Sequence, residues 1–480
     1  MTKDLQPVIL GGDIGAYSLA REFYEGYRVK SIVISGLSTG IMRHSNFVNH
    51  IAFDGIDDAE AVVAKLEQIA SDNRNKDLIV VASADWLVKV LVQNRSVLEA
   101  AGYTVPYTNI GPFEALTTKA GFYEACERLG VPYPKTKIVK IEPLVSTPGE
   151  DSRGHSTAGD INSDDSLDSA DAFAALLAQN DDIGFTFPLI AKASSTSAYH
   201  EIEFDGKKKV HKVDTPEELT KLLQDVQNAG YQGDFIIQDY IPGDDSGMRI
   251  LTCYSDREGK VRFAAYGEVL LEEHAPGALG NPAAIITKQN PEAVAAATRI
   301  LEDAGWTGVA NFDLKYDPRD GVAKFFELNP RLGRSNYYIA GAGANPVKFY
   351  VAEWMRGKYP DPITVLGGHV PLTPGPKTEH YAELAKEHLY TVVPLPLLAR
   401  YVFNPEQRKE LGKLVAKRAV SNPMWSKHER QPRRLLYVAI AQLNQFLKFH
   451  RHYSVTEAKK NYDEAEAALR QSKAKGAAGE

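Results

Sequence analysis

Cysteine is scarce in this chain of 480 residues, and its two cysteines, Cys126 and Cys253, lie far apart in the sequence. Two such distant cysteines form no disulfide framework and lack the spacing of a metal-binding pair, as is typical of proteins from a reducing compartment. Long apolar runs are missing as well, so we expect no membrane-spanning segment. The N-terminus lacks a basic region followed by an apolar stretch, so we expect no signal peptide and a cytoplasmic location.

Positive charge is not in excess, because the 55 Lys and Arg residues face 62 Asp and Glu residues and give a formal net charge of -7. This balance argues against a nucleic-acid partner. The content of 44% hydrophobic and 24% charged residues is ordinary for a soluble globular protein, and the length is enough for two or three domains. Residues 146–170 are rich in Ser, Asp, Gly and Thr and almost lack large apolar residues, which predicts a disordered insertion without a chemical role.

Apolar runs alternate with helical patterns in the first hundred residues. The expected strands cover residues 7–10, 31–35 and 77–83, with helices over 18–24 and 86–91. This alternation predicts a doubly wound parallel sheet.

A glycine-rich turn, Gly11 to Gly15, follows the first expected strand. Its irregular spacing and the absence of a clear acidic partner make it a weak signal for a nicotinamide or flavin site. Two other interpretations stay open: a tight turn that lets a helix pack on its strand, or helix N-terminal amides that hold a substrate carboxylate.

Residues 311–331, NFDLKYDPRDGVAKFFELNPR, read as two short strands joined by a turn. Because side chains on a strand alternate between its faces, Glu327 and Asn329 point the same way, and Asp313 can join them from the neighbouring strand. Two carboxylates and a carboxamide are the hard oxygen ligands that Mg²⁺ prefers, usually together with nucleotide phosphates. The alternative is a hairpin whose polar residues lie on a solvated face. The sequence favours the metal site, because Arg331 places a cation beside the acidic pair.

The C-terminal region, after about Pro360, is rich in basic residues and helical patterns. Leu436, Ile440, Leu443 and Leu447 recur at helical spacing. One interpretation is a helix that packs on the body of the protein. The other is a basic amphipathic helix, residues 430–452, that lies on an anionic membrane.

Several motifs occur in one order along the chain: Lys119 before a helix, Lys192 on a strand, QDYIPGDD, Asp313 and FFELNPR. Together they resemble the ATP-grasp superfamily of ATP-dependent carboxylate–amine ligases. The resemblance implies an N-terminal α/β domain (1–116), an ATP-grasp domain of two α+β subdomains (117–355) and a mostly helical C-terminal region (356–480). Within the superfamily, the opening GGDIGAYSLAREFY, the AKASST strand and the basic C-terminal region look most like the D-aspartate ligase group.

The resemblance also implies a nucleotide site. Lys119 and Lys192 match two lysines that hold phosphates, and Gln238 sits where an adenine-binding glutamate is common, since an amide oxygen can accept the same hydrogen bond. Asp245 is the candidate for the ribose hydroxyls, with Asp244 as the alternative. The remaining implied ATP-binding residues are Ser194, within a phosphate loop at 194–197 that lacks the usual glycines, and Asp239, Tyr240 and Ile241 in the hinge.

The implied metal ligands are Asp313, Glu327 and Asn329, for Mg²⁺ with Mn²⁺ as an alternative ion. Arg331 matches the cation that steadies the transferring phosphoryl group. Near the substrate carboxylate or the acyl-phosphate we place Arg249, Arg334 and His274, although His274 reads equally well as a surface-loop histidine.

The implied activity joins a carboxylate, such as that of an amino acid, to an amine through an acyl-phosphate. For the D-aspartate ligase group, the acid is D-aspartate and the amine is a lysine side chain of a peptidoglycan precursor, which could be lipid-linked. The alternatives are a ligase of nucleotide or dipeptide biosynthesis, or a non-catalytic ATP-binding regulator. The sequence leaves the homo-oligomeric state open.

Overall fold

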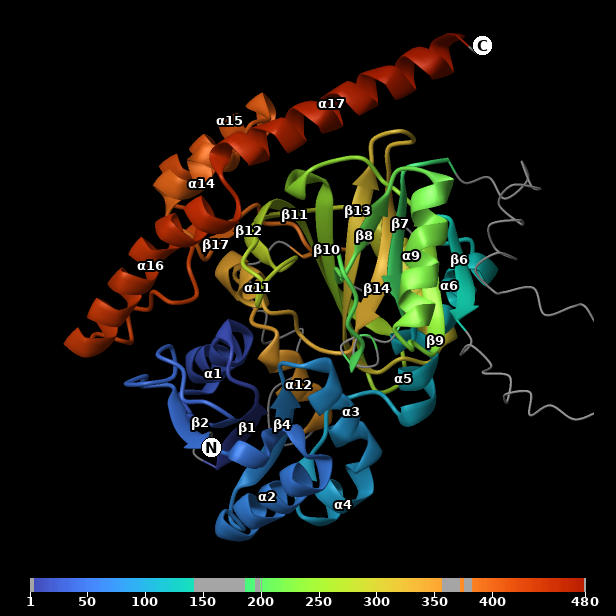
Figure 1. The fold of residues 1–480 in the computed structure, drawn as a ribbon. Coiled ribbons are helices and arrows are strands. Elements are labelled where there is room, and N and C mark those ends of the chain that lie inside the picture. The colour runs from blue at the N-terminus through green and yellow to red at the C-terminus, as the bar shows by residue number, and fades with distance from the viewer. Residues whose placement is uncertain are drawn as a thin grey trace, which may run out of the picture. The chain divides into compact units, whose positions relative to one another are not determined.

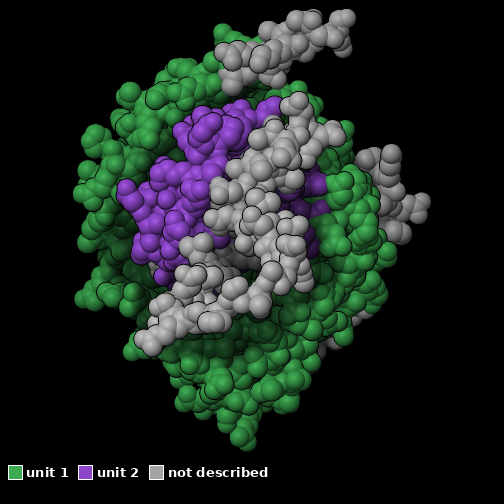
Figure 2. Space-filling model, turned by 45° about the vertical axis from the view of Figure 1, so that its right-hand side comes forward, with its two compact units in different colours: residues 1–117, 124–132, 242–480 green, residues 118–123, 133–241 purple. Residues whose placement is uncertain are grey.

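The computed structural model describes residues 4–141, 186–194, 199, 201–355, 372–374 and 382–478. The predicted insertion at 146–170 and most of the predicted phosphate loop, 195–197, lie outside these residues. The chain forms two compact units, coloured in Figure 2: unit 1 comprises residues 1–117, 124–132 and 242–480, and unit 2 comprises residues 118–123 and 133–241. The three domains predicted from the sequence remain a prediction, because one compact unit can contain more than one domain.

Unit 1 begins with a five-stranded parallel sheet, as predicted, in the order β3-β2-β1-β4-β5. Its strands are β1 (Leu5–Leu10), β2 (Ser31–Ser35), β3 (Val48–Ala52), β4 (Asp77–Ala82) and β5 (Tyr103–Thr104). The helices that follow them are α1 (Ile14–Tyr27), the 3-10 turn η1 (Asp54–Asp57), α2 (Ala59–Asp72), α3 (Asp85–Gln93), α4 (Arg95–Ala100) and α5 (Ile110–Thr117).

Helices cover both faces of this sheet (Figure 1). Phe23 of α1 packs in the core on one face, whereas Leu66 of α2 and Leu91 of α3 pack in a separate core on the other. The chain leaves β1 and β4, which are neighbours, toward opposite faces. Their carboxyl ends therefore flank the switch point at which open α/β sheets bind ligands.

A larger, mostly antiparallel sheet follows in unit 1, with the strand path β14-β13-β10-β11-β12-β17-β18 among the described residues. Its strands are β10 (Met248–Ser255), β11 (Val261–Glu272), β12 (Pro282–Lys288), β13 (Gly308–Asp317), β14 (Val322–Asn329), β15 (Leu372–Pro374), β16 (Ala382–Leu384), β17 (Leu389–Thr391) and β18 (Val420–Ser421). The helices around it are the 3-10 turn η3 (Asp245–Gly247), α10 (Pro291–Asp303), α11 (Tyr337–Ala342) and α12 (Val347–Trp354). Pro291 and the cap Asn290, whose side chain accepts from the Ala293 amide, start α10.

Among its described residues, unit 2 is a four-stranded antiparallel sheet in the order β6-β9-β7-β8, on which helix α9 packs. Its elements are β6 (Thr136–Ile141), β7 (Leu189–Ala193), β8 (His211–Val213), α9 (Pro216–Asn228) and β9 (Gly233–Asp239), while α6 (Lys119–Arg128) has residues in both units. Phe235, Ile237 and Leu189 point from the sheet into a core that they share with Leu219 and Leu223 of α9.

The C-terminal helices of unit 1 are α14 (Leu395–Tyr401), α15 (Pro405–Ala416), α16 (Pro432–His452) and α17 (Val455–Ala478). In the described part of the chain, none of the helices has the length and apolar content needed to traverse a bilayer.

The face of α16 that packs on the body is not the one marked by the predicted apolar positions. Val438 and Phe449 are buried, at 1% and 2% exposure. The predicted positions, by contrast, are exposed: Leu436 62%, Ile440 48%, Leu443 67% and Leu447 70%. The helix thus packs on unit 1, as one of the two interpretations expects, but through other residues than these four.

Candidate active site

The β13–β14 hairpin brings the three predicted metal ligands together. In its register, Asp313 lies opposite Glu327 and Asn311 lies opposite Asn329, so all four side chains share one face of the sheet. The Asn329 Nδ2 atom donates to the Asp313 Oδ2 atom at 3.1 Å. The register shifts after Asp313, and this irregularity lets Leu314 pair with Phe325 while Asp313 keeps Glu327 as its partner.

The two carboxylates form an electrostatically strained pair. Burial and, second, the negative charge of Glu327 raise the pKa of Asp313 to about 7, although Arg331 and the Asn329 hydrogen bond oppose the shift. Two partly buried carboxylates at one point favour a shared proton or a bound cation over two free charges. This donor set of two carboxylates and one carboxamide therefore fits a divalent cation.

Two further charged residues, which the sequence analysis missed, belong to the same electrostatic cluster. Burial and, second, the charge of Asp245 raise the pKa of Glu272 to about 8. The charge of Lys315 lowers this pKa, and the charge of Asp313 raises it further. Lys315 follows Asp313 by two positions on β13, so the period-two alternation of a strand could have predicted its place on the same face. For Glu272 the sequence offers only the acidic pair Glu272-Glu273 at a strand end, which is a weak signal.

The described residues contain no cluster of three or more His, Cys, Asp or Glu side chains that could hold a metal ion by themselves. The hairpin set has only two carboxylates and one amide. It therefore suits a cation, such as Mg²⁺, that takes its other ligands from water and phosphate.

The turn of the hairpin is fixed by Asp317, whose side chain is fully buried. It accepts hydrogen bonds from the Arg319 amide at 3.0 Å, from the Arg319 Nε atom at 2.8 Å and from the Lys324 Nζ atom at 2.6 Å. Burial opposes ionisation of this carboxylate, but the hydrogen bonds from Arg319 and Lys324 outweigh it and lower the pKa of Asp317 to about 2. Asp317 thus links β13 to β14 at the turn end of the hairpin, beyond the metal ligands.

Arg331 and Arg334 lie near the switch point of the parallel sheet. The Arg331 Nε atom is 2.8 Å from the Asp85 Oδ1 atom at the start of α3. The Arg334 Nη1 atom lies 3.9 Å from the Glu273 Oε1 atom, and the Arg334 Cα atom would be 3.1 Å from a Cβ placed on Gly15. The glycine at position 15 therefore permits the close approach of Arg334 to the start of α1.

The third predicted catalytic arginine, Arg249, is not brought to the metal ligands. On β10, Ile250 pairs with Asp313 and Arg249 pairs with Leu314, so Arg249 points to the opposite face of the sheet. There its Nη1 atom donates to the Ser246 carbonyl at 2.7 Å and its guanidinium lies 5.5 Å from the centre of the Tyr316 ring. Its catalytic role remains a prediction that this placement does not support.

The candidate ribose residue, Asp245, contacts His274. The Asp245 Oδ2 atom accepts from the Glu272 amide at 2.9 Å and lies 2.9 Å from the His274 Nε2 atom. The His274 ring stacks on the Tyr453 ring, with centroids 3.5 Å apart. The alternative ribose residue, Asp244, instead caps η3 through Ser246, at 2.6 Å from the hydroxyl. Asp245 thus belongs to a partly buried polar cluster with Glu272 and His274.

In unit 2, the side-chain amide of Gln238 is the candidate hydrogen-bonding group for a nucleotide base. Its side chain is fully buried, and its Nε2 atom donates to the Tyr123 hydroxyl at 2.9 Å and to the Thr136 hydroxyl at 2.8 Å. Among the described residues, the Oε1 atom has no hydrogen-bond partner. Buried acceptors without a partner are rare, and such an atom needs a donor from a ligand or a water. The free amide oxygen therefore fits the exocyclic amino group of adenine.

Lys192 shares the face of unit 2 that carries Gln238. Ile236, the partner of Lys192 in the register, precedes Gln238 by two residues on β9, so both side chains point away from the core under α9. The Lys119 Nζ atom reaches the Ala193 carbonyl at 3.5 Å, beside Lys192. The structure thus brings both predicted phosphate lysines to one end of β7.

The remaining predicted hinge residues continue from β9. The Asp239 amide donates to the Lys135 carbonyl at 2.9 Å, the Tyr240 ring centre lies 5.3 Å from the Lys212 Nζ atom, and Ile241 is buried. The Ser194 amide donates to the Asp234 carbonyl at 2.9 Å.

Comparisons with known proteins agree with the resemblance predicted from the motifs. No family model matches the chain. The D-aspartate ligase of Enterococcus faecium (strain Aus0004) is 29% identical over 454 residues, which cover 94% of this chain and 97% of that protein.

Two solved structures share the fold. The N5-carboxyaminoimidazole synthetase of Staphylococcus aureus, complexed with ADP, has a TM-score of 0.51 and 13% identity, and the match covers 80% of this chain and 81% of that one. The biotin carboxylase domain of the Hydrogenobacter thermophilus 2-oxoglutarate carboxylase, in complex with MgADP, has a TM-score of 0.51 and 14% identity, with 74% and 71% covered. The predicted fold class is confirmed: the chain has the ATP-grasp fold and resembles D-aspartate ligase along nearly its full length.

Proposed function

We propose that this ATP-dependent carboxylate–amine ligase activates the β-carboxylate of D-aspartate and transfers it to an amine of a peptidoglycan precursor. The acid is the one named by the D-aspartate ligase that the chain resembles along nearly its full length, and the amine is the one that the motif resemblance to that group implies. The single observation that carries the chemistry is the oxygen cluster of Asp313, Glu327 and Asn329 on one face of the β13–β14 hairpin.

The reaction needs an activated acyl group, because a carboxylate cannot expel oxide. Transfer of the γ-phosphoryl group from ATP gives an acyl-phosphate and ADP, and attack by the amine then releases phosphate. Such a sequence asks the protein for positioning and charge neutralisation rather than for a covalent nucleophile. Bound Mg²⁺ supplies charge neutralisation at the phosphates, and Asp313, Glu327 and Asn329 are the residues that would hold it.

In this proposal, unit 2 binds the adenine base. Gln238 accepts a hydrogen bond from the adenine amino group through its free Oε1 atom, while Tyr240 and Ile241 present backbone groups to the base edge. Lys119 and Lys192 supply ammonium groups to the phosphates. Asp245 is the candidate partner of the ribose hydroxyls.

The carboxylate substrate is recognised by cations near the switch point. Arg334 approaches the start of α1, and Arg331 lies beside Asp85 at the start of α3. A guanidinium suits a carboxylate or an acyl-phosphate because its donors form a planar fork. We assign the acyl-phosphate to Arg331 and the α-carboxylate of the amino acid to Arg334.

The acceptor amine belongs, in this proposal, to a cytoplasmic cell-wall precursor that could be lipid-linked. A ligase of nucleotide or dipeptide biosynthesis would share the same metal and nucleotide residues, so it stays an alternative. A regulator that binds ATP without turnover would not need Arg331 beside the metal ligands.

A screen of ADP release tests the proposal. Purified protein is supplied with ATP, Mg²⁺, a panel of D- and L-amino acids and peptides that carry a free lysine side chain. We expect ADP to form only when D-aspartate and the peptide are both present. The Glu327→Ala variant should lose this activity, whereas the control Glu203→Ala, at an exposed ion pair of unit 2, should keep it. ATP binding without ADP formation across the panel would favour a regulator.

A further inference from the structure

One face of α16 is apolar and exposed. At roughly 100° per residue, Leu436, Ile440, Leu443 and Leu447 fall within an arc of about 60° along this 21-residue helix. Each is between 48% and 70% exposed. Isolated exposed leucines are common on proteins, but an aligned row on one helix marks an interaction surface. We call these four residues the α16 stripe.

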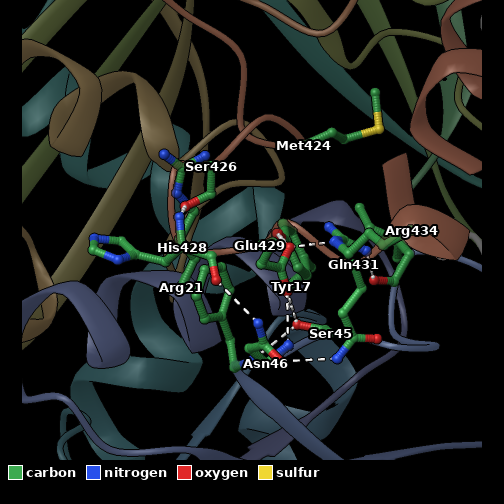
Figure 3. A network of polar contacts seen from close by, with 12 residues as sticks. Tyr17, Arg21, Ser45, Asn46, Met424, Ser426, His428, Glu429, Gln431 and Arg434 are labelled. Carbon is green, nitrogen blue, oxygen red and sulfur yellow. Dashed lines mark hydrogen bonds and ion pairs between the residues drawn. The ribbon is translucent and has the colours of Figure 1, made fainter. Parts of the chain in front are cut away.

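The opposite face of α16 packs on the rest of unit 1. The α16 stripe is therefore not the face by which this helix packs on the protein. Arg434 is 1% exposed and pairs with Glu429, which is also buried. Figure 3 shows this network, in which Glu429 also accepts from Tyr17, from Ser45 and from the Asn46 amide. The Arg434 Nη1 atom donates to the Ile41 carbonyl at 2.6 Å.

Further along the helix, the Gln442 Nε2 atom donates to the Val392 carbonyl at 2.9 Å, and Lys448 pairs with Glu273. These contacts, with buried Val438 and Phe449, fix the rotation of α16 about its own axis. Figure 1 shows α16 at the edge of unit 1. The stripe is therefore presented outward by the packing of the rest of the helix.

The charges around the stripe indicate its partner. Between positions 411 and 456 the only acidic residue is Glu429, which is 2% exposed and neutralised by Arg434. The exposed charged residues at and near both ends of the stripe are basic: Lys427, Arg430, Arg433 and Arg451. This local excess contrasts with the net charge of -7 of the whole chain. A second copy of the same surface would bring like charges together, whereas an anionic lipid surface complements both the leucines and the cations.

We propose that the α16 stripe and its flanking cations dock the protein on an anionic lipid bilayer, with the helix axis in the plane of the membrane. The leucines enter the boundary between headgroups and acyl chains, and the arginines contact lipid phosphates. No transmembrane segment is required, in accord with the lack of a long apolar helix among the described residues. This docking does not depend on the ligase reaction, and it would bring the enzyme close to lipid-linked acceptors.

Co-sedimentation of the full chain with vesicles tests the proposal. Vesicles of phosphatidylcholine alone are compared with vesicles that also contain phosphatidylglycerol. We expect binding to the anionic vesicles that weakens with added salt. The double variant Leu443→Asp/Leu447→Asp should lower the partition coefficient by more than about 100-fold, since two exposed leucines lose their burial in lipid. The matched control, Leu37→Asp, changes a leucine that is 80% exposed elsewhere in unit 1 and should bind as the unchanged chain does.

Two further variants test the apolar and the basic parts of this surface separately. Leu436→Ser/Ile440→Ser, in the first half of the stripe, should also weaken binding, which keeps the test valid if the aspartate pair misfolds. Arg430→Gln/Arg433→Gln should weaken binding to anionic vesicles about 30-fold, at about 1 kcal/mol for each basic residue. Binding to vesicles of phosphatidylcholine alone should not change.

Three results would overturn the proposal: no binding of the unchanged chain to anionic vesicles, binding that survives loss of the stripe in a folded variant, or a lipid-free dimer that Leu443→Asp/Leu447→Asp dissociates without any vesicle binding. The last result would assign the stripe to a second copy of the chain. None of the three depends on ADP release, so failure here is distinct from failure of the proposed reaction.

Discussion

Replacing Gln238 by methionine tests the assignment of the adenine site. Methionine keeps the length of the side chain and removes both the carbonyl oxygen and the NH2 group of the amide. Among the described residues the buried Oε1 atom has no partner, so its removal should stabilise the folded state. The lost bonds to Tyr123 and Thr136 should offset this gain to within about 1 kcal/mol. The nucleotide loses one buried hydrogen bond, worth about 1–3 kcal/mol. The dissociation constant for ATP should therefore rise about 5- to 150-fold.

The assay compares ATP with inosine triphosphate, which carries a carbonyl oxygen in place of the adenine amino group. The unchanged protein should prefer ATP, because the carbonyl would face the Gln238 Oε1 atom as a second acceptor. In Gln238→Met this preference should fall toward parity. The control Gln224→Met makes the same substitution on α9, the helix over the opposite face of the sheet, and should keep the preference. A Gln238→Met protein that binds ATP as tightly as before, with the same preference over inosine triphosphate, would refute the adenine assignment.

Three further substitutions test the β13–β14 hairpin and the Glu429–Arg434 pair that holds α16 on unit 1. Glu327→Ala should abolish Mg²⁺-dependent ADP release while leaving the melting temperature unchanged or higher, because it relieves a partly buried pair of like charges; full turnover would contradict the metal assignment. Asp317→Asn should lower the free energy of unfolding by about 2 kcal/mol near neutral pH. Because its folded pKa of about 2 lies below the usual value of 3.8, this stabilisation is present above about pH 4 and is lost as the pH falls toward 2, so urea unfolding of both proteins should converge in acid. Glu429→Gln leaves Arg434 buried without its charge partner and should cost about 3–5 kcal/mol in urea unfolding, and a cost near zero would show that the network does not anchor α16.

The hairpin shows how far local sequence determines the site. The alternation of polar and apolar residues, with a turn at Asp317 to Gly321, predicts that Asp313 and Glu327 face each other, and the register agrees. A strand pair that is contiguous in sequence needs no information from the rest of the chain. The cluster with Glu272 could not be predicted in the same way, because β11 reaches β13 only through β10.

The orientation of α16 shows where sequence periodicity ends. Leu436, Ile440, Leu443 and Leu447 form the more regular apolar arc, but Val438 and Phe449 are the residues that pack inward. The rotation of the helix is set by Arg434 and its buried contacts with residues nearly four hundred positions away. A periodic pattern identifies an apolar face, but it does not tell whether protein or lipid covers that face.

The transfer of a carboxylate oxygen to phosphate tests the central claim most directly. D-Aspartate labelled with ¹⁸O in its β-carboxylate is incubated with the protein, ATP, Mg²⁺ and a lysine-containing cell-wall peptide, and the phosphate released is analysed by mass spectrometry. Activation through an acyl-phosphate predicts one labelled oxygen in each phosphate released. Label found in AMP, or amide formation with unlabelled phosphate, would contradict the proposed reaction.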